Sequence, residues 1–499
     1  MGTSANINLN NLNLDAGNWP ITVSAISERI DESDVQDTAA TYQVRTAFTY
    51  DLSSDGNYYI LASYQGDANS VEIESTYNNK PVREIKANAF SGNSTITSVY
   101  IPATVSKIGY KAFYNCTSLT YVAIRSNSDS PELVIETSAF ENCTALSTAD
   151  IPYRVTEIGE MAFRKCTSLA TFNLNTAENA PELTIGVSAY AECTAITSLI
   201  VPDRVVDIDD YAFEGCTSLA AIGLRTSDEF PTLRIGIGTF RYCEKLKTLS
   251  IIDRVNAIGS FAFQGCKALT TVSFGSNSKL SAIAGSVFKD CVNLESVYLP
   301  SSVQSIGITA FSGCTSLVYV SAETITSIGN SAFEGCSALE EVSISSASTL
   351  KQIPHKAFYG CTSLRKIRIP ESVAGIADFA FGGCTALASG QVSFDNPYGW
   401  FTTITLPFNV TDVDAIYIDS ALLSSSATAG SKIPTAEESS LAVYMCRLTK
   451  MITPTISIDN NTGTLTVDEP TGIATGFKVY VDNVHYATYE VDTGVLRMA

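Results

Sequence analysis

The sequence predicts a β-rich repeat solenoid, in which short units stack side by side and share one core. Three observations favour this fold class. An aromatic residue followed three residues later by a cysteine recurs at a nearly fixed period, short strand patterns recur between these stations, and proline and glycine follow many of the strands. A period of this length is typical of units that bury their apolar faces only by stacking on their neighbours. The function is therefore expected on a long repetitive surface.

The positions of the cysteines define the length of the repeat unit. Twelve of the 13 cysteines lie 22 to 27 residues apart, and a thirteenth station, at Phe90, carries Asn93 in the cysteine position. The spacing predicts about 13 units of 22–27 residues. We expect the cysteines to form one structural ladder through the core, made of Cys116, Cys143, Cys166, Cys193, Cys216, Cys243, Cys266, Cys291, Cys314, Cys336, Cys361 and Cys384.

Three roles are open to such a ladder. A metal site requires cysteines two to four residues apart, and the closest pair in the ladder is 22 residues apart, which argues against metal binding. Cysteines on adjacent coils would lie about 5 Å apart, within reach of a disulfide, yet their side chains would point the same way. The favoured interpretation is a column of reduced, buried thiols that behave as small apolar side chains. The pattern leaves the redox compartment open.

One complete unit, residues 119–143, shows how the core is expected to form. Leu119, Val122 and Ile124 follow the Leu-x-x-Val-x-Ile spacing of a leucine-rich repeat, and their alternation predicts a short strand with one buried face. Many strands are followed by Ile-Pro-x-x-Val-x-x-Ile-Gly, as at residues 101–109. Proline has no N–H to donate, so it marks the end of the strand and the turn into the next edge of the coil.

The longer motif over residues 101–119, Ile-Pro-x-x-Val-x-x-Ile-Gly-x-x-Ala-Phe-x-x-Cys-Thr-Ser-Leu, resembles the BspA-like leucine-rich repeats of surface proteins from gut and oral bacteria and some protists. The resemblance covers roughly residues 46–395. It implies an N-terminal cap over residues 46–90 and repeats over residues 91–395. It also implies an extracellular or cell-surface location and a role in adhesion or recognition, with varied ligands.

The two ends of the chain resemble the halves of a fibronectin type III-like sandwich in reversed order. Residues 1–45 are similar to its last three strands, and residues 451–499 are similar to its first four. Between the repeats and the second half, residues 396–450 are predicted to form a degenerate repeat, a C-terminal cap and an exposed loop. The solenoid is therefore expected to be flanked by partial all-β sandwich segments.

Each half-sandwich alone would expose strand edges and half of a core. Strand complementation that joins the C-terminal half of one molecule to the N-terminal half of the next would propagate into a fibre. The alternative is that the halves were cut from a longer array of sandwich and repeat units. Head-to-tail self-association through the termini is therefore one of the expected interactions.

Composition limits both the partners and the chemistry. With 31 basic and 51 acidic residues the formal charge is −20, which argues against binding of nucleic acid or an anionic membrane. No apolar run has the length of a membrane span, and residues 1–5 lack the regions of a signal peptide. Only His355 and His485 are present, too few for a histidine-based triad or metal cluster. We expect a non-enzymatic protein with no catalytic residue, no metal and no cofactor.

Tyrosines interrupt the small residues that face solvent on the predicted strands. Tyr100 and Tyr121 come from adjacent early units, and Tyr298 and Tyr319 come from adjacent late units. Aromatic side chains with a polar tip are favoured at recognition surfaces, so both pairs are candidate ligand-binding residues. Packing across neighbouring strands is the alternative role.

A second candidate surface follows a longer rhythm, because every second unit between Cys116 and Cys266 carries a longer polar loop. The paired units repeat every 50 residues and place Arg154, Arg204 and Arg254 in a column. Regularly spaced arginines can bind carboxylates or sulfates on a polymer. The alternative, which we favour, is a ladder of surface ion pairs with acids such as Asp203.

These observations together predict an adhesion or recognition protein that binds a host or neighbouring-cell protein or a glycan through the repeat surface. A self-assembling structural or virion fibre, built by complementation of the terminal half-sandwiches, is the alternative.

Overall fold

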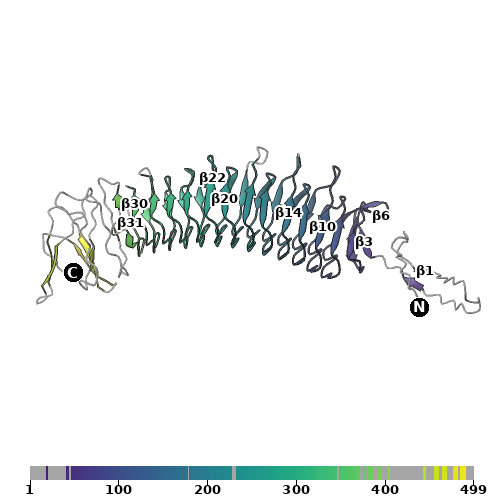
Figure 1. Ribbon diagram of the computed structural model, residues 1–499, viewed down its shortest axis with the longest axis horizontal. Coiled ribbons are helices and arrows are strands. Elements are labelled where there is room, and N and C mark those ends of the chain that lie inside the picture. The colour runs from purple at the N-terminus through teal and green to yellow at the C-terminus, as the bar shows by residue number, and fades with distance from the viewer. Residues whose placement is uncertain are drawn as a thin grey trace, which may run out of the picture.

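The computed structural model describes residues 47–386, except positions 178, 227–231, 346–347, 371, 374 and 378. Outside that range it describes only the backbone of strands β1, β2 and β32 to β38. The described chain forms a solenoid of short coils that follow one another in chain order along a gently curved array, from β3 near one end to β30 and β31 at the other (Figure 1). This confirms the predicted fold class.

One wall of the solenoid is built from the Leu-x-x-Val-x-Ile segments. These strands pair in parallel and in register within two consecutive sheets, so that Val122 lies beside Val99 and Ile124 beside Ile101. They are β5 (Ser70–Glu72), β8 (Ser98–Ile101), β10 (Tyr121–Ile124), β12 (Thr148–Ile151), β14 (Thr171–Leu174), β16 (Ser198–Val201), β18 (Ala221–Leu224), β20 (Thr248–Ile251), β22 (Thr271–Phe274), β24 (Ser296–Tyr298), β26 (Tyr319–Ser321), β28 (Glu341–Ser343), β30 (Lys366–Ile369) and β32 (Gln391–Phe394). We call the outward side of this wall the strand face.

A second parallel wall is built from the Val-x-x-Ile segments that follow the proline turns. Its strands are β7 (Lys80–Ile85), β9 (Lys107–Ile108), β11 (Leu133–Ile135), β13 (Val155–Ile158), β15 (Leu183–Ile185), β17 (Val205–Ile208), β19 (Leu233–Ile235), β21 (Val255–Ile258), β23 (Ala282–Ile283), β25 (Ser305–Ile306), β27 (Ser327–Ile328), β29 (Gln352–Ile353), β31 (Gly375–Ile376) and β33 (Thr403–Ile404). The apolar residues of the two walls are buried in one continuous core.

An aromatic stack runs through this core. Each coil from Phe90 to Phe381 contributes one ring, and neighbouring rings lie 4.6 to 5.8 Å apart with interplanar angles of at most 17°. Tyr190 takes one position of the stack, and all other positions hold phenylalanine. Stacked rings add attraction beyond the burial of their area, so the stack ties each coil to the next.

The cysteine ladder lies beside the aromatic stack. All twelve thiols are buried and free of disulfides. Each Sγ donates to the backbone carbonyl oxygen of the stacked aromatic residue in the preceding coil, at 3.0 to 3.4 Å. At the first station the half-buried Asn93 does not extend this ladder; its side-chain oxygen accepts from the backbone N–H groups of Thr95 and Ile96.

The glycine after the second strand allows the coils to approach closely. A Cβ atom on Gly259 would lie 2.5 Å from the backbone carbon of Gly236 and 2.5 Å from the backbone nitrogen of Ile237 in the preceding coil. Real Cβ atoms do not approach backbone so closely, so the close approach of these two coils depends on glycine at position 259.

An antiparallel hairpin covers the N-terminal end of the second wall. It consists of β3 (Phe48–Leu52) and β4 (Tyr59–Tyr64), and β4 pairs in parallel with β7, while β6 (Thr76–Tyr77) pairs with β7 from the other side. The ring of Tyr64 stacks on Phe90 at 5.2 Å, which places an aromatic residue of the hairpin at the end of the core stack.

At the two ends the structure describes strands but no side chains. Strands β1 (Asn18–Pro20) and β2 (Thr41–Gln43) form an antiparallel pair. Towards the C-terminus, β35 (Thr455–Asp459) pairs with β36 (Thr464–Asp468), and β34 (Ala442–Tyr444), β37 (Gly476–Val481) and β38 (Val484–Glu490) form a small antiparallel sheet. The four strands β35 to β38 lie within residues 451–499, where the first four strands of a sandwich are expected from the sequence. The expected sandwich itself and the cap over residues 396–450 lie outside the described residues.

Candidate binding surfaces

Small and polar side chains cover most of the strand face, and two tyrosine pairs interrupt it. The ring centroids of Tyr100 and Tyr121 lie 6.0 Å apart with a T-shaped arrangement, and those of Tyr298 and Tyr319 lie 5.5 Å apart. In each pair the first tyrosine is the third residue of its strand and the second is the first residue of the next strand. The two pairs are therefore equivalent diagonal contacts at two places along the same face.

The late pair is the more exposed one. Tyr298 keeps 63% of its surface in solvent, which makes it the most exposed large apolar or aromatic side chain of the described residues, and the neighbouring Val318 keeps 41%. Tyr319 is half-buried. A side chain of this size gains little stability where it is so exposed, so folding alone does not explain Tyr298.

An ion pair adjoins each tyrosine pair. Arg125 lies over the ring of Tyr100 at 5.7 Å and pairs with Glu72 at 2.8 Å. At the late pair, Glu341 lies beside Tyr319 in the sheet register and pairs with Lys366 at 2.7 Å. The two ion pairs were not predicted from the sequence, although the positions of their residues follow from the in-phase register of the strands.

The three arginines proposed as a surface column lie inside the solenoid, so both surface roles predicted for them are wrong. Arg154, Arg204 and Arg254 are 3%, 0% and 5% exposed. Desolvation lowers the pKa of Arg154 and Arg204 to about 10. A buried guanidinium cannot bind a polymer, and none of the three forms an ion pair with a described acid.

Backbone carbonyl oxygens hold these guanidinium groups. Arg204 donates from Nε to Asn175 at 2.8 Å and from Nη1 to Val155 at 2.8 Å. Arg154 and Arg254 make the same contacts at positions shifted by one 50-residue period, to Arg125 and Val105 and to Arg225 and Val205. The physical reason is the longer loop of every second coil, whose inward carbonyls need donors. The acids that flank the three arginines accept other hydrogen bonds. Asp203 accepts from the backbone N–H of Arg204, and Asp253 accepts from the backbone N–H of Asn277.

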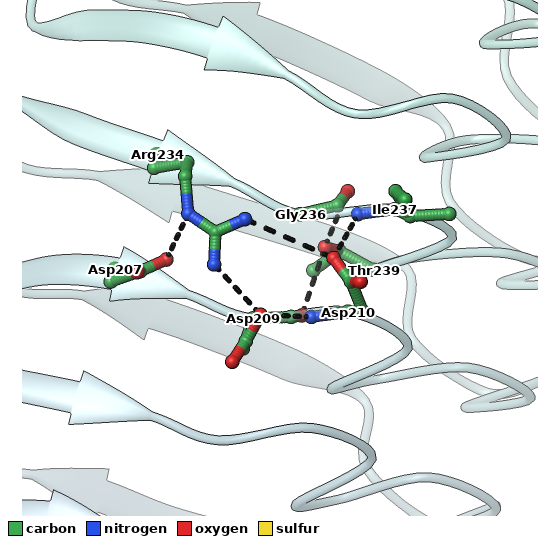
Figure 2. A network of polar contacts seen from close by, with 7 residues as sticks. All are labelled: Asp207, Asp209, Asp210, Arg234, Gly236, Ile237 and Thr239. Atoms are coloured by element: carbon green, nitrogen blue, oxygen red, sulfur yellow. Dashed lines mark hydrogen bonds and ion pairs between the residues drawn. The ribbon is translucent and has the colours of Figure 1, made fainter.

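A polar network on the second wall departs from the repeat (Figure 2). Asp209 stands where most coils have the close-packed glycine, and its Oδ1 accepts from Arg234 at 2.7 Å. Arg234 also contacts Asp207 at 2.9 Å and Asp210 at 3.8 Å. Burial raises the pKa of Asp207, and hydrogen bonds, chiefly to Asp209, raise the pKa of Arg234. One guanidinium therefore balances part of the charge of three carboxylates, as a structural cross-link between adjacent coils.

A third surface is formed by the turns around the core aromatic residues, and we call it the turn face. Each turn holds one left-handed residue two positions before the core ring and one two positions after it, as Lys111 and Asn115 do around Phe113. Exposed aromatic side chains gather at several of these turns. The sequence analysis missed them, although an aromatic residue at a position that elsewhere holds glycine, asparagine or serine is a readable signal.

The described residues contain no group of three or more His, Cys, Asp or Glu side chains arranged to hold a metal ion. In the same part of the chain no helix has the length and apolar character needed to cross a membrane.

Several solved structures and one family model are similar to this chain. A search of curated proteins gave no match. Among solved structures, the chain is similar to a leucine-rich cell surface protein from Faecalibacterium prausnitzii, with 25% identity over 71% of this chain and 94% of that one and a TM-score of 0.42. It is also similar to a leucine-rich repeat protein from Bacteroides ovatus, with 25% identity over 73% of this chain and 99% of that one and a TM-score of 0.43.

The pneumococcal vaccine antigen PcpA is a further similar structure, with 18% identity over 72% of this chain and 97% of that one and a TM-score of 0.40. The family model for the BspA type leucine-rich repeat region matches residues 68–181, 183–318, 233–349 and 281–396. These matches extend over most of the described solenoid, and the stacked coils have the core that the repeat motif requires. The chain therefore belongs to the BspA-type leucine-rich repeat family.

Proposed function

We propose that the protein is a non-enzymatic adhesion or recognition protein, displayed at a cell surface or secreted, whose strand face binds a protein of a host or neighbouring cell. The observation that carries this proposal is the late tyrosine patch, formed by Tyr298, Val318, Tyr319 and the ion pair between Glu341 and Lys366.

A protein is the partner that fits this patch best. Tyrosine dominates the energetic centres of protein interfaces because it buries a large area at a low cost in side-chain entropy. The patch combines this anchor with an apolar neighbour, Val318, and with charges at its rim, which is the arrangement of an interface centre bounded by polar groups. The patch lies on the outward side of the paired strands β24, β26, β28 and β30, which offer a broad surface rather than an enclosed site for a small molecule.

The test is a binding screen on immobilised extracellular matrix and cell-surface proteins, with the wild-type protein and a Tyr298→Ser, Tyr319→Ser variant. Serine already occupies the equivalent positions of neighbouring coils, at Ser321 and Ser296, so the variant should keep its fold. We expect at least tenfold weaker binding of the variant to any protein that the wild type captures. Equal binding by both proteins would exclude the patch as the recognition site.

Head-to-tail assembly is the second proposed function. It is supported by the small antiparallel sheets at the two ends, β1–β2, β35–β36 and β34–β37–β38, each of which has few strands and unpaired edges among the described residues. Such sheets gain stability when another strand completes them. Light scattering after size exclusion, over a wide range of concentrations, should show species larger than a monomer that disappear when residues 451–499 are deleted. A monomer at every concentration would exclude assembly.

A further inference from the structure

Three consecutive coils carry aromatic residues at left-handed positions of the turn face. Tyr211, Tyr242 and Phe261 have φ values of 58°, 60° and 63°. The fold imposes positive φ at these positions in every coil, and the other coils mostly use glycine, asparagine, serine or lysine there. Bulky aromatic residues rarely adopt this conformation, and strained residues of this kind concentrate at functional sites. Phe379 is a fourth aromatic residue with positive φ, at 58°, but the three residues named above lie in consecutive coils, which distinguishes this part of the turn face.

Glycines in the following coil make room for two of the rings. A Cβ on Gly238 would lie 2.5 Å from Cε1 of Tyr211, and a Cβ on Gly265 would lie 2.5 Å from Cδ1 of Tyr242. Each ring therefore rests against the backbone of its neighbour coil. Tyr242 remains 39% exposed and Phe261 38% exposed, so the aromatic surfaces stay available to a ligand. We call Tyr211, Tyr242 and Phe261 the aromatic platform.

Arg241 joins the aromatic platform to polar groups. Its guanidinium carbon lies 4.6 Å from the ring centre of Tyr242 and 6.0 Å from that of Phe261. Nε donates to Gln264 at 2.9 Å, Nη1 to Glu214 at 3.4 Å and Nη2 to the hydroxyl of Tyr242 at 2.9 Å. A guanidinium has five N–H groups, so two remain after these three contacts. The remaining N–H donors of Arg241 and the carboxylate acceptor of Glu214 therefore lie side by side, next to the aromatic rings.

The network of Figure 2 fixes the position of this platform. Asp210, which precedes Tyr211, accepts from the backbone N–H of Ile237 at 2.7 Å, and Ile237 precedes the glycine on which the Tyr211 ring rests. Arg234 holds Asp209 and Asp210 in turn. The coils beneath the platform are therefore cross-linked by side chains as well as by backbone hydrogen bonds, and such support is what a preorganised binding site needs.

We infer that the aromatic platform and Arg241 form a binding site for a neutral glycan chain. The apolar face of a sugar ring can pack on a flat aromatic side chain, and its neighbouring hydroxyl groups can accept from Arg241 and donate to Glu214. The charges of Arg241 and Glu214 cancel locally, and the chain carries a formal charge of −20, so a polyanionic glycan is disfavoured. This site lies on the turn face, apart from the strand-face patch of the proposed function.

Two similar clusters on the same face favour a polymer over a single sugar. Towards the N-terminus, Lys111 lies 5.1 Å from the ring centre of the exposed Tyr110 and 4.8 Å from that of Tyr114. Towards the C-terminus, Lys356 lies 5.0 Å from the ring centre of Tyr359, which is 39% exposed. Aromatic and cationic groups therefore recur along the line of turns, and a linear chain that contacts several clusters gains affinity from the repetition.

The test compares the full-length wild-type protein with a platform variant, Tyr211→Ser, Tyr242→Gly, Phe261→Ser. Each substitution places at its site a residue that other coils carry at the same turn position, namely Ser286 and Ser331 before the core ring and Gly215 and Gly265 after it. Folding should therefore be retained, which thermal unfolding checks. The probes are an array of neutral oligosaccharides of glucose, galactose and mannose in α and β linkage, with heparin as the polyanionic comparison. The strand-face variant Tyr298→Ser, Tyr319→Ser is the matched control.

We expect the wild type and the strand-face variant to bind the same neutral oligosaccharides, and the platform variant to bind them at least tenfold more weakly. Absence of binding to every neutral oligosaccharide, equal binding by the platform variant, or a preference for heparin would each overturn the inference. Equal protein capture by the wild type and the strand-face variant in the screen described above, with glycan binding by the wild type intact, would count against the strand-face patch alone.

Discussion

Nη1 of Arg204 donates a 2.8 Å hydrogen bond to the carbonyl oxygen of Val155, which lies 49 residues earlier in the chain. The same guanidinium donates to carbonyl oxygens of Asn175 and Pro152. Arg204 is fully buried, so a cation rests among backbone oxygens with no carboxylate partner for its guanidinium among the described residues. The side chain therefore acts as a staple between coils, and its charge is solvated by the backbone.

Replacement of Arg204 by methionine should destabilise the protein by about 2 to 4 kcal/mol, because several buried carbonyl oxygens lose their donors. An Arg204→Lys variant should recover only part of the lost stability, because an ammonium group lacks the planar fork of N–H groups with which arginine reaches all of these oxygens. The exposed Arg125→Met is the matched control and should cost about 1 kcal/mol or less. Urea unfolding followed by circular dichroism measures the differences. Equal stability of the Arg204 and Arg125 variants would contradict the role of a staple.

Replacement of Tyr190 by phenylalanine should stabilise the protein. Tyr190 is fully buried in the aromatic stack, and its hydroxyl has no hydrogen-bond partner among the described residues. An unsatisfied buried hydroxyl costs about 1 to 3 kcal/mol, and phenylalanine removes that cost while keeping the ring stack.

The reverse substitution, Phe213→Tyr in the adjacent coil, should destabilise by a similar amount. Differential scanning calorimetry of both variants gives the two signs in one experiment. A lower melting temperature for Tyr190→Phe would show that the hydroxyl has a favourable role.

The ladder thiols should be unreactive in the folded protein. Burial raises the pKa of Cys243, Cys266 and Cys291 above the ordinary thiol range, so these thiols stay protonated at pH 8. Ellman's reagent should label none of the twelve ladder cysteines until a denaturant is added, in a background where Cys446, outside the described residues, is serine. Rapid labelling of the native protein would contradict the buried ladder.

The same shift predicts a loss of stability at alkaline pH. Above the ordinary thiol pKa of about 8.5 the unfolded chain ionises Cys243, Cys266 and Cys291, while burial keeps these three thiols protonated in the folded chain. The unfolded state then binds fewer protons, so the free energy of unfolding falls as pH rises. Urea titrations at pH 7.5 and pH 9.5 measure how far the free energy of unfolding falls between these pH values. A Cys243→Ala, Cys266→Ala variant should show a smaller fall.

Arg234 should stabilise the protein more at neutral than at acidic pH. At pH 7 the Asp207 carboxylate is ionised and lies beside the guanidinium. Burial raises the pKa of Asp207, so at pH 3 this carboxyl group is protonated and most of its attraction to Arg234 is lost. Arg234→Gln should therefore lower the melting temperature clearly at pH 7 and little at pH 3. The expected loss in the free energy of unfolding at pH 7 is about 1 kcal/mol, because the side chains are partly exposed. An Asp209→Asn change in the same variant should restore part of the loss. An effect of equal size at both pH values would contradict the electrostatic account.

Local rules in the sequence predicted most of the fold. The alternation of apolar residues at Val122 and Ile124, the proline turns and the cysteine period identify the units and their strands, because each unit repeats the same steric and hydrogen-bonding requirements. The diagonal contact of Tyr298 with Tyr319 also follows, since strands in phase bring these positions together. Segments without the repeat pattern offered no such rule, and only their short strands are described.

The sequence by itself determined the solenoid, its two walls and the column of core cysteines. Only the tertiary structure decided where Arg154, Arg204 and Arg254 lie, because an arginine beside a polar loop reads as exposed until the loop of the neighbouring coil is seen to cover it. The aromatic platform was decided in the same way: Tyr211, Tyr242 and Phe261 are far apart in the sequence, and stacking of left-handed turns brings them to one surface. The repeat pattern determines which residues form the core of each unit, because every unit has the same packing requirements. Contacts between neighbouring coils determine which of the remaining side chains are covered and which are exposed on the surface.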